Sequence, residues 1–186
     1  MSRFETIKTP LEGLKVIKRQ PIGDSRGYFE RLFCNEELEP LLDGKSIMQI
    51  NYSKSTTKAG VRGLHFQYPP YAEKKFVSCI KGVIFDVALD LRPDSKTFLH
   101  WHAEILCEDD HKTFLVPEGF AHGFQSLSDD CRLIYCCSAP YNAETESGIN
   151  PMDPRAGIRW PMEITEISAK DKNRDFVNDT FAGVKL

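Results

Sequence analysis

The sequence has no long run of apolar residues. Its most apolar stretches, such as VIFDVAL at residues 83–89, carry a charge. They are far shorter than the about 20 residues that a membrane-spanning helix needs. The first residues, MSRFETIKTPLEGLKV, lack the apolar centre of a secretory signal peptide. We therefore expect a cytoplasmic protein that has no membrane partner.

Concentrated positive charge is also missing. The chain has 24 Lys and Arg residues against 27 Asp and Glu residues, a formal net charge of −3, and no basic block. Nucleic acid is therefore not expected as a partner. The sequence shows no repeat, linker or low-complexity segment, and its 186 residues, 41% of them hydrophobic, can bury a sizeable core. These properties predict a single domain over residues 1–186.

No CxxC motif occurs among the cysteines. Cys136 and Cys137 are adjacent, and neighbouring strand residues point to opposite faces, so this pair suits neither a disulfide nor a shared metal ion. We expect small, buried thiols in a reducing compartment. The cysteines are Cys34, Cys79, Cys107, Cys131, Cys136 and Cys137.

Strand signals dominate the sequence. Many segments are rich in β-branched and aromatic residues, alternate apolar with polar positions, and are separated by turn sequences. Only residues 35–42 and 168–173 resemble short helices, the second with Ser168 as a candidate N-cap. This pattern predicts an all-β sandwich or barrel, with the segment after Trp160 packed over it. The predicted strands are residues 14–22, 27–34, 46–53, 75–80, 83–91, 98–106, 113–118 and 131–137.

Two histidines stand in unusual surroundings. His65 lies in the strand-like run GVRGLHFQ (60–67), and His122 lies between glycines in VPEGFAHGF (116–124). Taken alone, His65 suits a structural histidine, a metal ligand or a base, and His122 suits a hydrogen-bonded turn as well as a ligand contact. A metal-binding cupin would need a His-x-His strand with a further Glu and a distant His, but Gln67 occupies the second position here.

The remaining His-x-His motif does not complete a metal site either. His100 and His102 would share one face of a strand, but no carboxylate follows at a suitable spacing. We interpret them as residues of a solvated strand face and expect no metal cofactor.

Several motifs, taken in order, resemble the dTDP-4-dehydrorhamnose 3,5-epimerase family of cupins. The resemblance covers residues 24–171 and implies a jelly-roll barrel that dimerises by exchanging an N-terminal strand. It also implies a nucleotide-linked 4-keto-6-deoxyhexose as substrate and no metal or organic cofactor. The motifs are DSRGYF (24–29), QINYSKS (49–55), GVRGLHFQ (60–67), PPYAEKKFV (69–77), GVIFDVALDLRPDS (82–95), VPEGFAHGF (116–124), YCCSAPYN (135–142), DP (153–154), IRWP (158–161) and SAKD (168–171).

The resemblance assigns catalytic roles to four residues. His65 would remove a proton next to the ketone, and Asp171 would orient His65 and raise its basicity. Lys75 would stabilise the enolate, whereas its neighbour Lys74 should point the other way. Tyr135 would return a proton on the opposite face, which calls for a cation near its phenol because an ordinary phenol is a weak acid.

Other residues would bind the substrate. By resemblance, Arg62 and a partner subunit's Arg26 hold the diphosphate, His122 contacts sugar or phosphate, Gln49 lines the nucleotide-sugar pocket, and Tyr141 shapes it.

One position departs from the family pattern. The family usually has Glu where this chain has Arg31, and here Glu30 comes one residue earlier. The nucleotide therefore stays open between dTDP, CDP and others, and the reaction stays open between inversion at carbon 3, carbon 5 or both. A sugar 3,4-ketoisomerase, a non-catalytic sugar-binding cupin and a metal-dependent oxygenase are the weaker alternatives.

Overall fold

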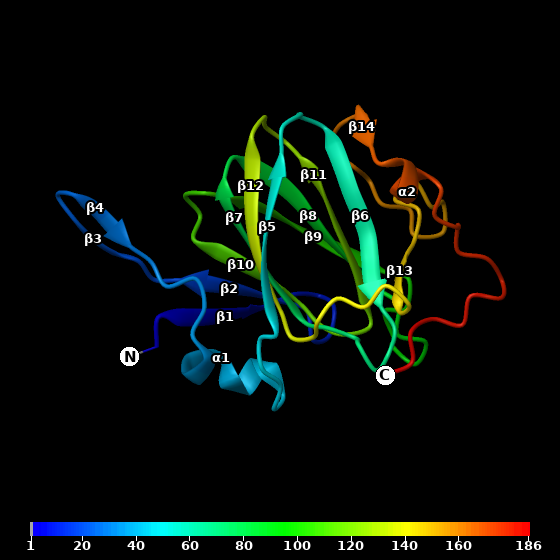
Figure 1. Cartoon of the computed structure of the whole chain (residues 1–186), viewed down its shortest axis with the longest axis horizontal. Coiled ribbons are helices and arrows are strands. Elements are labelled where there is room, and N and C mark those ends of the chain that lie inside the picture. The colour runs from blue at the N-terminus through cyan, green and yellow to red at the C-terminus, as the bar shows by residue number, and fades with distance from the viewer. Residues whose placement is uncertain (1) are drawn as a thin grey trace.

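Two antiparallel sheets face each other and form a barrel in the computed structural model, which describes residues 2–186 (Figure 1). The first sheet has the order β1 (Phe4–Lys8), β2 (Lys15–Arg19), β10 (Lys112–Val116), β7 (Lys75–Lys81), β12 (Cys131–Cys137) and β5 (Gln49–Ser55). The second sheet has the order β13 (Glu146–Gly148), β6 (Gly60–Gln67), β11 (Phe120–Ser126), β8 (Val83–Asp90) and β9 (Trp101–Cys107), with β14 (Glu166–Ile167) parallel to β6. The predicted all-β jelly-roll cupin fold is confirmed.

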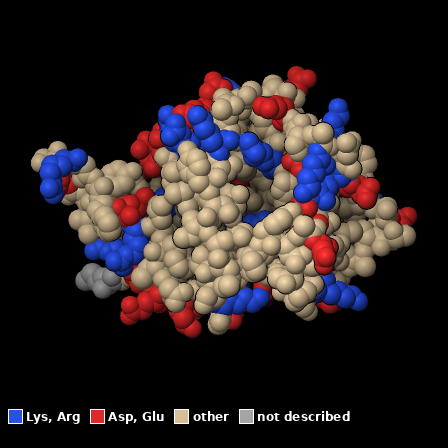
Figure 2. Space-filling view, viewed as in Figure 1, with Lys and Arg blue, Asp and Glu red and all other residues tan. Residues whose placement is uncertain are grey.

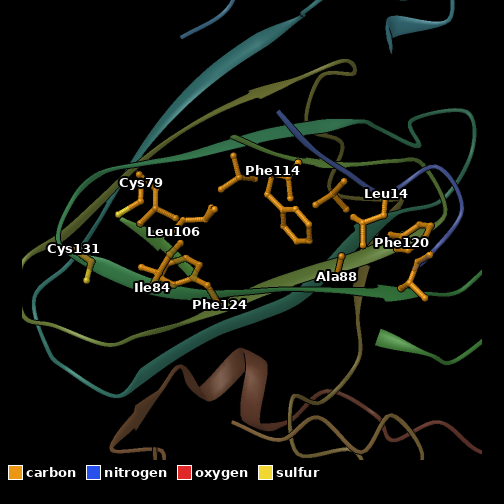
Figure 3. Packing of buried hydrophobic residues seen from close by; sticks show 14 residues of the cluster. Leu14, Cys79, Ile84, Ala88, Leu106, Phe114, Phe120, Phe124 and Cys131 are labelled. Atoms are coloured by element: carbon orange, nitrogen blue, oxygen red, sulfur yellow. The ribbon is translucent and has the colours of Figure 1, made fainter. Parts of the chain in front are cut away.

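The space between the sheets holds the main core. Alternating apolar residues of both sheets point inward, and Figure 3 shows Phe114 of the first sheet with Phe124 and Ile84 of the second. Phe114 and Ile84 are fully buried. Burying a side chain of this size contributes about 1.5–3 kcal/mol, so this layer is the main source of the barrel's stability.

Two further layers cover the outer faces. The helix α1 (Asn35–Leu42) packs Leu38 and Leu42 against the outside of the first sheet, at Ile17 and Phe76. The C-terminal segment covers the outside of the second sheet through residues such as Trp160, Val177 and Val184. The predicted packing of the segment after Trp160 over the barrel is thus observed.

Two smaller elements matter for the site. The helix α2 (Ala169–Lys172) begins after Ser168, whose Oγ accepts a hydrogen bond from the backbone N–H of Asp171 at 3.0 Å, as an N-cap does. The strands β3 (Ile22–Asp24) and β4 (Gly27–Phe29) form a hairpin that projects away from the barrel (Figure 1).

Most predicted elements are present with shifted ends, and α1 and β12 have the predicted bounds. The strand predicted for residues 27–34 is wrong beyond Phe29, because the chain leaves the hairpin there and enters α1 after Cys34. No helix within residues 2–186 is long and apolar enough to cross a membrane.

Candidate active site

A cavity of about 400 Å³ opens between the two sheets, and Figure 2 shows basic side chains around a hollow on this face of the molecule. Strands β6 and β11 of the second sheet line one wall, and β5, β7 and β12 of the first sheet line the other. The segment from β14 to α2 closes a third side. Of the residues predicted from the sequence, the cavity brings together His65, Asp171, Lys75, Tyr135, Arg62 and His122.

His65 and Asp171 form a hydrogen-bonded pair in the cavity wall. The His65 Nε2 lies 2.6 Å from Asp171 Oδ1, and the side chains are 37% and 5% exposed. Since a carboxylate accepts, Nε2 carries the proton, and Nδ1 makes no hydrogen bond to residues 2–186. His65 therefore offers the cavity a nitrogen lone pair.

The Asp171 carboxylate is held ionised. Burial alone would raise the pKa of Asp171, but hydrogen bonds from His65, the Gly63 N–H and the Ser168 side chain outweigh burial and lower the pKa below its ordinary value. The carboxylate can therefore fix the His65 ring and stabilise a proton that the ring takes up.

A bulge in β6 places two functional side chains on one wall. His65 pairs with His122 across the strands, yet Arg62 pairs with Phe124, so two residues of β6 oppose Gly123 alone. Arg62 and His65 consequently both face the cavity, although strict alternation would separate them. Arg62 is held by Ser55 Oγ at 3.0 Å from Nε.

His122 has its own buried carboxylate. Its Nε2 lies 2.7 Å from Oδ1 of Asp86, whose side chain is fully buried. The other oxygen, Oδ2, has no hydrogen-bond partner within residues 2–186. His122 is therefore a strand residue with a fixed ring and not part of a tight turn.

The two neighbouring lysines point in opposite directions. Lys75 lines the cavity, with Nζ 3.2 Å from Oε1 of Glu73. Lys74 lies under α1, where Nζ donates to the Leu41 carbonyl at 2.8 Å and pairs with Asp43. Of these two lysines, Lys75 is the one that can place its charge near a bound substrate.

Tyr135 lies on β12 in the same wall as Lys75. Burial, with smaller effects from Cys137 and Glu73, raises the pKa of the Tyr135 phenol, and Arg62 offsets part of this rise. The phenol is therefore protonated at neutral pH and able to donate, with the expected cation nearby.

The profile of one family matches most of this chain. It is described as dTDP-4-dehydrorhamnose 3,5-epimerase and matches residues 8–179. The chain belongs to the dTDP-4-dehydrorhamnose 3,5-epimerase family. The family predicted from the sequence motifs is thus confirmed.

Individual relatives of this epimerase family cover nearly the whole chain. The chain is 42% identical over 177 residues to dTDP-4-dehydrorhamnose 3,5-epimerase of Methanothermobacter thermautotrophicus, covering 93% of this chain and 94% of the relative. A crystal structure of the Bacillus anthracis enzyme with TDP and PPi bound has a TM-score of 0.89, 36% identity and coverage of 94% and 99%. The Legionella pneumophila enzyme in complex with dTDP-4-keto-L-rhamnose has a TM-score of 0.88, 36% identity and coverage of 93% and 92%.

Three residues that the family resemblance assigned to substrate binding lie outside the cavity wall, as does Arg31, which departs from the family pattern. Gln49 and Tyr141 lie together, where Gln49 Oε1 accepts from the Tyr141 N–H at 3.1 Å, and Tyr141 is 58% exposed. Arg26 is on the projecting hairpin, paired with Asp24. Arg31 pairs with Glu37 of α1 at 2.5 Å.

Two carboxylates that pair with cavity-lining residues were not predicted. Asp86 interrupts the apolar run VIFDVAL, and a single charge in a buried strand was a usable signal. Glu73 lies in a loop between proline-rich and apolar segments, and no sequence pattern distinguishes it from a solvated residue. In the structure Asp86 pairs with His122, and Glu73 pairs with Lys75.

The two histidines of the His-x-His motif have different surroundings. His100 is exposed and precedes β9, whereas His102 is half-buried and lies 2.9 Å from Glu104. The His102 side chain is 24% exposed, so this strand face is partly solvated. Within residues 2–186, no group of three or more His, Cys, Asp or Glu residues is arranged to hold a metal ion.

Proposed function

We propose that this protein epimerises a nucleotide-linked 4-keto-6-deoxyhexose, converting dTDP-4-dehydro-6-deoxyglucose to dTDP-4-dehydrorhamnose. The observation that carries the proposal is the His65–Asp171 pair, 2.6 Å apart, in one cavity with Lys75 and Tyr135. Relatives with this name match the chain over most of its length, and a solved relative holds dTDP-4-keto-L-rhamnose.

The first step is proton removal next to the ketone. Carbons 3 and 5 of a 4-keto sugar carry weakly acidic hydrogens, because the resulting carbanion is an enolate. His65 Nδ1 takes this proton while the Nε2–H remains bonded to Asp171, whose charge stabilises the imidazolium. A general base of this kind contributes about 10²–10⁴-fold to the rate.

The enolate needs a positive charge and the product needs a proton on its other face. Lys75 comes from the sheet opposite His65 and supplies the charge near the ketone oxygen. Tyr135, on the same sheet as Lys75, returns the proton, and the resulting phenolate lies near Arg62. Proton removal from one wall and return from the other inverts the carbon without a cofactor.

Substrate binding uses cations of the cavity and of a second subunit. Arg62 and His122 contact phosphate and sugar, while Gln49 and Tyr141 border the nucleotide. Arg26 of the partner subunit completes the diphosphate site, and Arg31 lies near the nucleotide. The exposed hairpin residues Tyr28 and Phe29 and the exposed face of edge strand β5 provide apolar surface for a homodimer.

Two further predictions remain part of the proposal. Residues 1–186 act as one domain. The enzyme works in the cytoplasm, which suits the six free cysteines.

Solvent-deuterium incorporation tests the reaction directly. The purified protein is incubated in D₂O with dTDP-4-dehydro-6-deoxyglucose or its CDP counterpart, and NMR follows carbons 3 and 5. Deuterium at both carbons of the dTDP sugar supports the proposal. Deuterium at one carbon identifies a mono-epimerase, and faster exchange with the CDP sugar corrects the nucleotide. No exchange with either sugar contradicts the assigned function.

A further inference from the structure

The contacts that hold the β3–β4 hairpin lie near its root, where it joins the barrel. Every residue of both strands is exposed, and the hairpin projects away from the barrel (Figure 1), with the Tyr28 ring in contact with His111 of the barrel. Arg26 at its turn has a side chain that is 87% exposed and paired only with Asp24 of the same hairpin. Whatever holds this arm in place must therefore act where it joins the barrel.

A buried ion pair joins the two chain segments at the root of the hairpin, one before β3 and one after β4. Arg19 is the last residue of β2, shortly before the hairpin, and Glu30 is the first residue after it. The Arg19 Nε lies 2.9 Å from Glu30 Oε1, and the side chains are only 1% and 10% exposed. Removing one partner of such a pair leaves an uncompensated buried charge, so the pair resists opening.

Arg19 is in turn fixed to the first sheet. Its Nη1 donates to Ser78 Oγ at 2.9 Å, the Lys112 carbonyl at 2.6 Å and Thr113 Oγ1 at 2.6 Å. These acceptors belong to β7 and β10, in the middle of the sheet. The guanidinium is a planar fork, so these contacts hold it beside Glu30, where Nε and Oε1 form an ion pair without an aligned hydrogen bond.

His111 holds both strands of the root. Its carbonyl accepts from the Arg19 N–H at 2.8 Å, and its Nδ1 lies 2.9 Å from Glu30 Oε1. Its ring also meets the Tyr28 ring edge-on, with centroids 5.2 Å apart. His111 therefore links the barrel to the strand that follows Arg26.

We propose that Arg19, Glu30 and His111 are positioning residues that set the angle at which the hairpin presents Arg26 to the cavity of a second copy of this chain. The inference rests on the proposed function and its dimer. An arm held in advance loses little conformational entropy on binding, so this root clamp raises affinity for the nucleotide sugar without touching it.

Glu30→Gln tests the clamp because it removes the charge and keeps the size. The matched control is Glu37→Gln, which breaks the more exposed pair with Arg31 close by. In Glu30→Gln, KM for the dTDP sugar should rise about fivefold or more while kcat changes less than twofold, because the root clamp acts on substrate binding and not on the chemical step. Arg26→Ala should also raise KM, and adding Glu30→Gln to it should raise KM no further. Independent, multiplying effects would overturn the inference.

Amide hydrogen exchange provides a readout that needs no substrate. Residues 22–29 should exchange faster in Glu30→Gln than in wild type, and should be unchanged in Glu37→Gln. If Glu30→Gln does not fold, His111→Asn replaces it, because Asn tolerates the positive φ of 55° at this position. Unchanged hairpin exchange overturns the clamp, whereas a lack of turnover by the wild-type protein overturns only the proposed function.

Discussion

At the scale of single residues, the direction in which a lysine side chain points decides whether it can act on the substrate. Lys74 and Lys75 are adjacent and nearly equally buried, with side chains 9% and 13% exposed. Lys74 neutralises the end of α1, where Leu41 offers a carbonyl and Asp43 a carboxylate. Lys75 faces the cavity, so the two lysines form a natural matched pair for mutation.

Lys75→Met should reduce deuterium exchange by about 10²-fold or more, because removing an oxyanion-stabilising group has this effect. Lys74→Met should leave exchange nearly unchanged and lower the free energy of unfolding by about 1–3 kcal/mol, since a buried carbonyl loses its donor. NMR exchange rates and urea unfolding measure the two effects. Equal loss of exchange in both variants would contradict the role of Lys75.

His65→Asn should abolish exchange at carbons 3 and 5 while the protein stays folded. The loss should reach about 10²–10⁴-fold, the usual contribution of a general base. His100→Asn is the control, because His100 is an exposed histidine outside the cavity. Substantial exchange by His65→Asn would mean that another group removes the proton.

At the scale of elements, the β6 bulge is the feature that builds the site. Gly63 has a φ of +116°, and a Cβ there would lie 2.5 Å from the Gly123 Cα and 2.8 Å from the His122 carbonyl oxygen. The strands can approach this closely only because neither glycine has a side chain. The approach brings Arg62 and His65 into one wall.

Gly63→Ala should therefore destabilise the fold by about 2–4 kcal/mol, combining backbone strain with overpacking. Gly60→Ala is the control in the same strand, since its added Cβ would meet nothing closer than 3.4 Å and its φ is not positive. Thermal and urea unfolding give the comparison. Similar stability of the two variants would mean that β6 and β11 can separate at little cost.

The sequence predicted regular strands and helices better than it predicted the β6 bulge and the glycine contact beside it. Residues 131–137 form a short, mostly apolar run directly after the turn sequence LSDD, and β12 has those bounds. Strand β11 was missed because Gly119 and Gly123 resemble a turn, whereas Gly123 serves the close approach to β6. Strict alternation likewise could not show that Arg62 and His65 share a face, because a bulge depends on the partner strand.

At the scale of the whole molecule, Asp90 links distant parts of the barrel. It receives hydrogen bonds from Ser95 at 2.6 Å, Thr97 at 2.7 Å and Arg92 at 2.8 Å. Arg92 also donates to the Glu12 carbonyl at 2.9 Å, so the network joins β8 to the N-terminal segment. Burial opposes ionisation here, but the hydrogen bonds from Arg92, Ser95 and Thr97 lower the pKa of Asp90 below its ordinary value of 3.8.

Stability should consequently depend on Asp90 ionisation. Because the folded-state pKa of Asp90 is below its ordinary 3.8, its contribution is full above that pH and is lost as pH falls through the lower folded-state value. Asp90→Asn should be less stable than wild type at pH 7, and the difference should shrink on acidification below pH 3.8. Urea unfolding across this range measures it, and a constant difference would show that the Asp90 charge does not matter.

The position of Arg26 also depends on the whole molecule, and no pattern in one chain could place it. The sequence motif identified an arginine next to glycine, but only the fold shows that it lies on an arm directed away from its own cavity. Gln49 and Tyr141, predicted as pocket residues, likewise lie beside the cavity wall and not in it.

The projecting hairpin has a consequence for mixtures of defective chains. If each arm serves the other copy, Arg26→Ala affects the partner's site and His65→Asn affects the chain's own site, so in a mixed dimer both substitutions fall in the same site. One site then carries both defects and the other carries none. When the two variants are unfolded, mixed and refolded, random pairing of subunits should leave about a quarter of all sites intact, and these sites should turn over substrate with the wild-type KM. A complete active site would then need two chains, and one intact His65 and one intact Arg26, on different chains, would be enough for turnover.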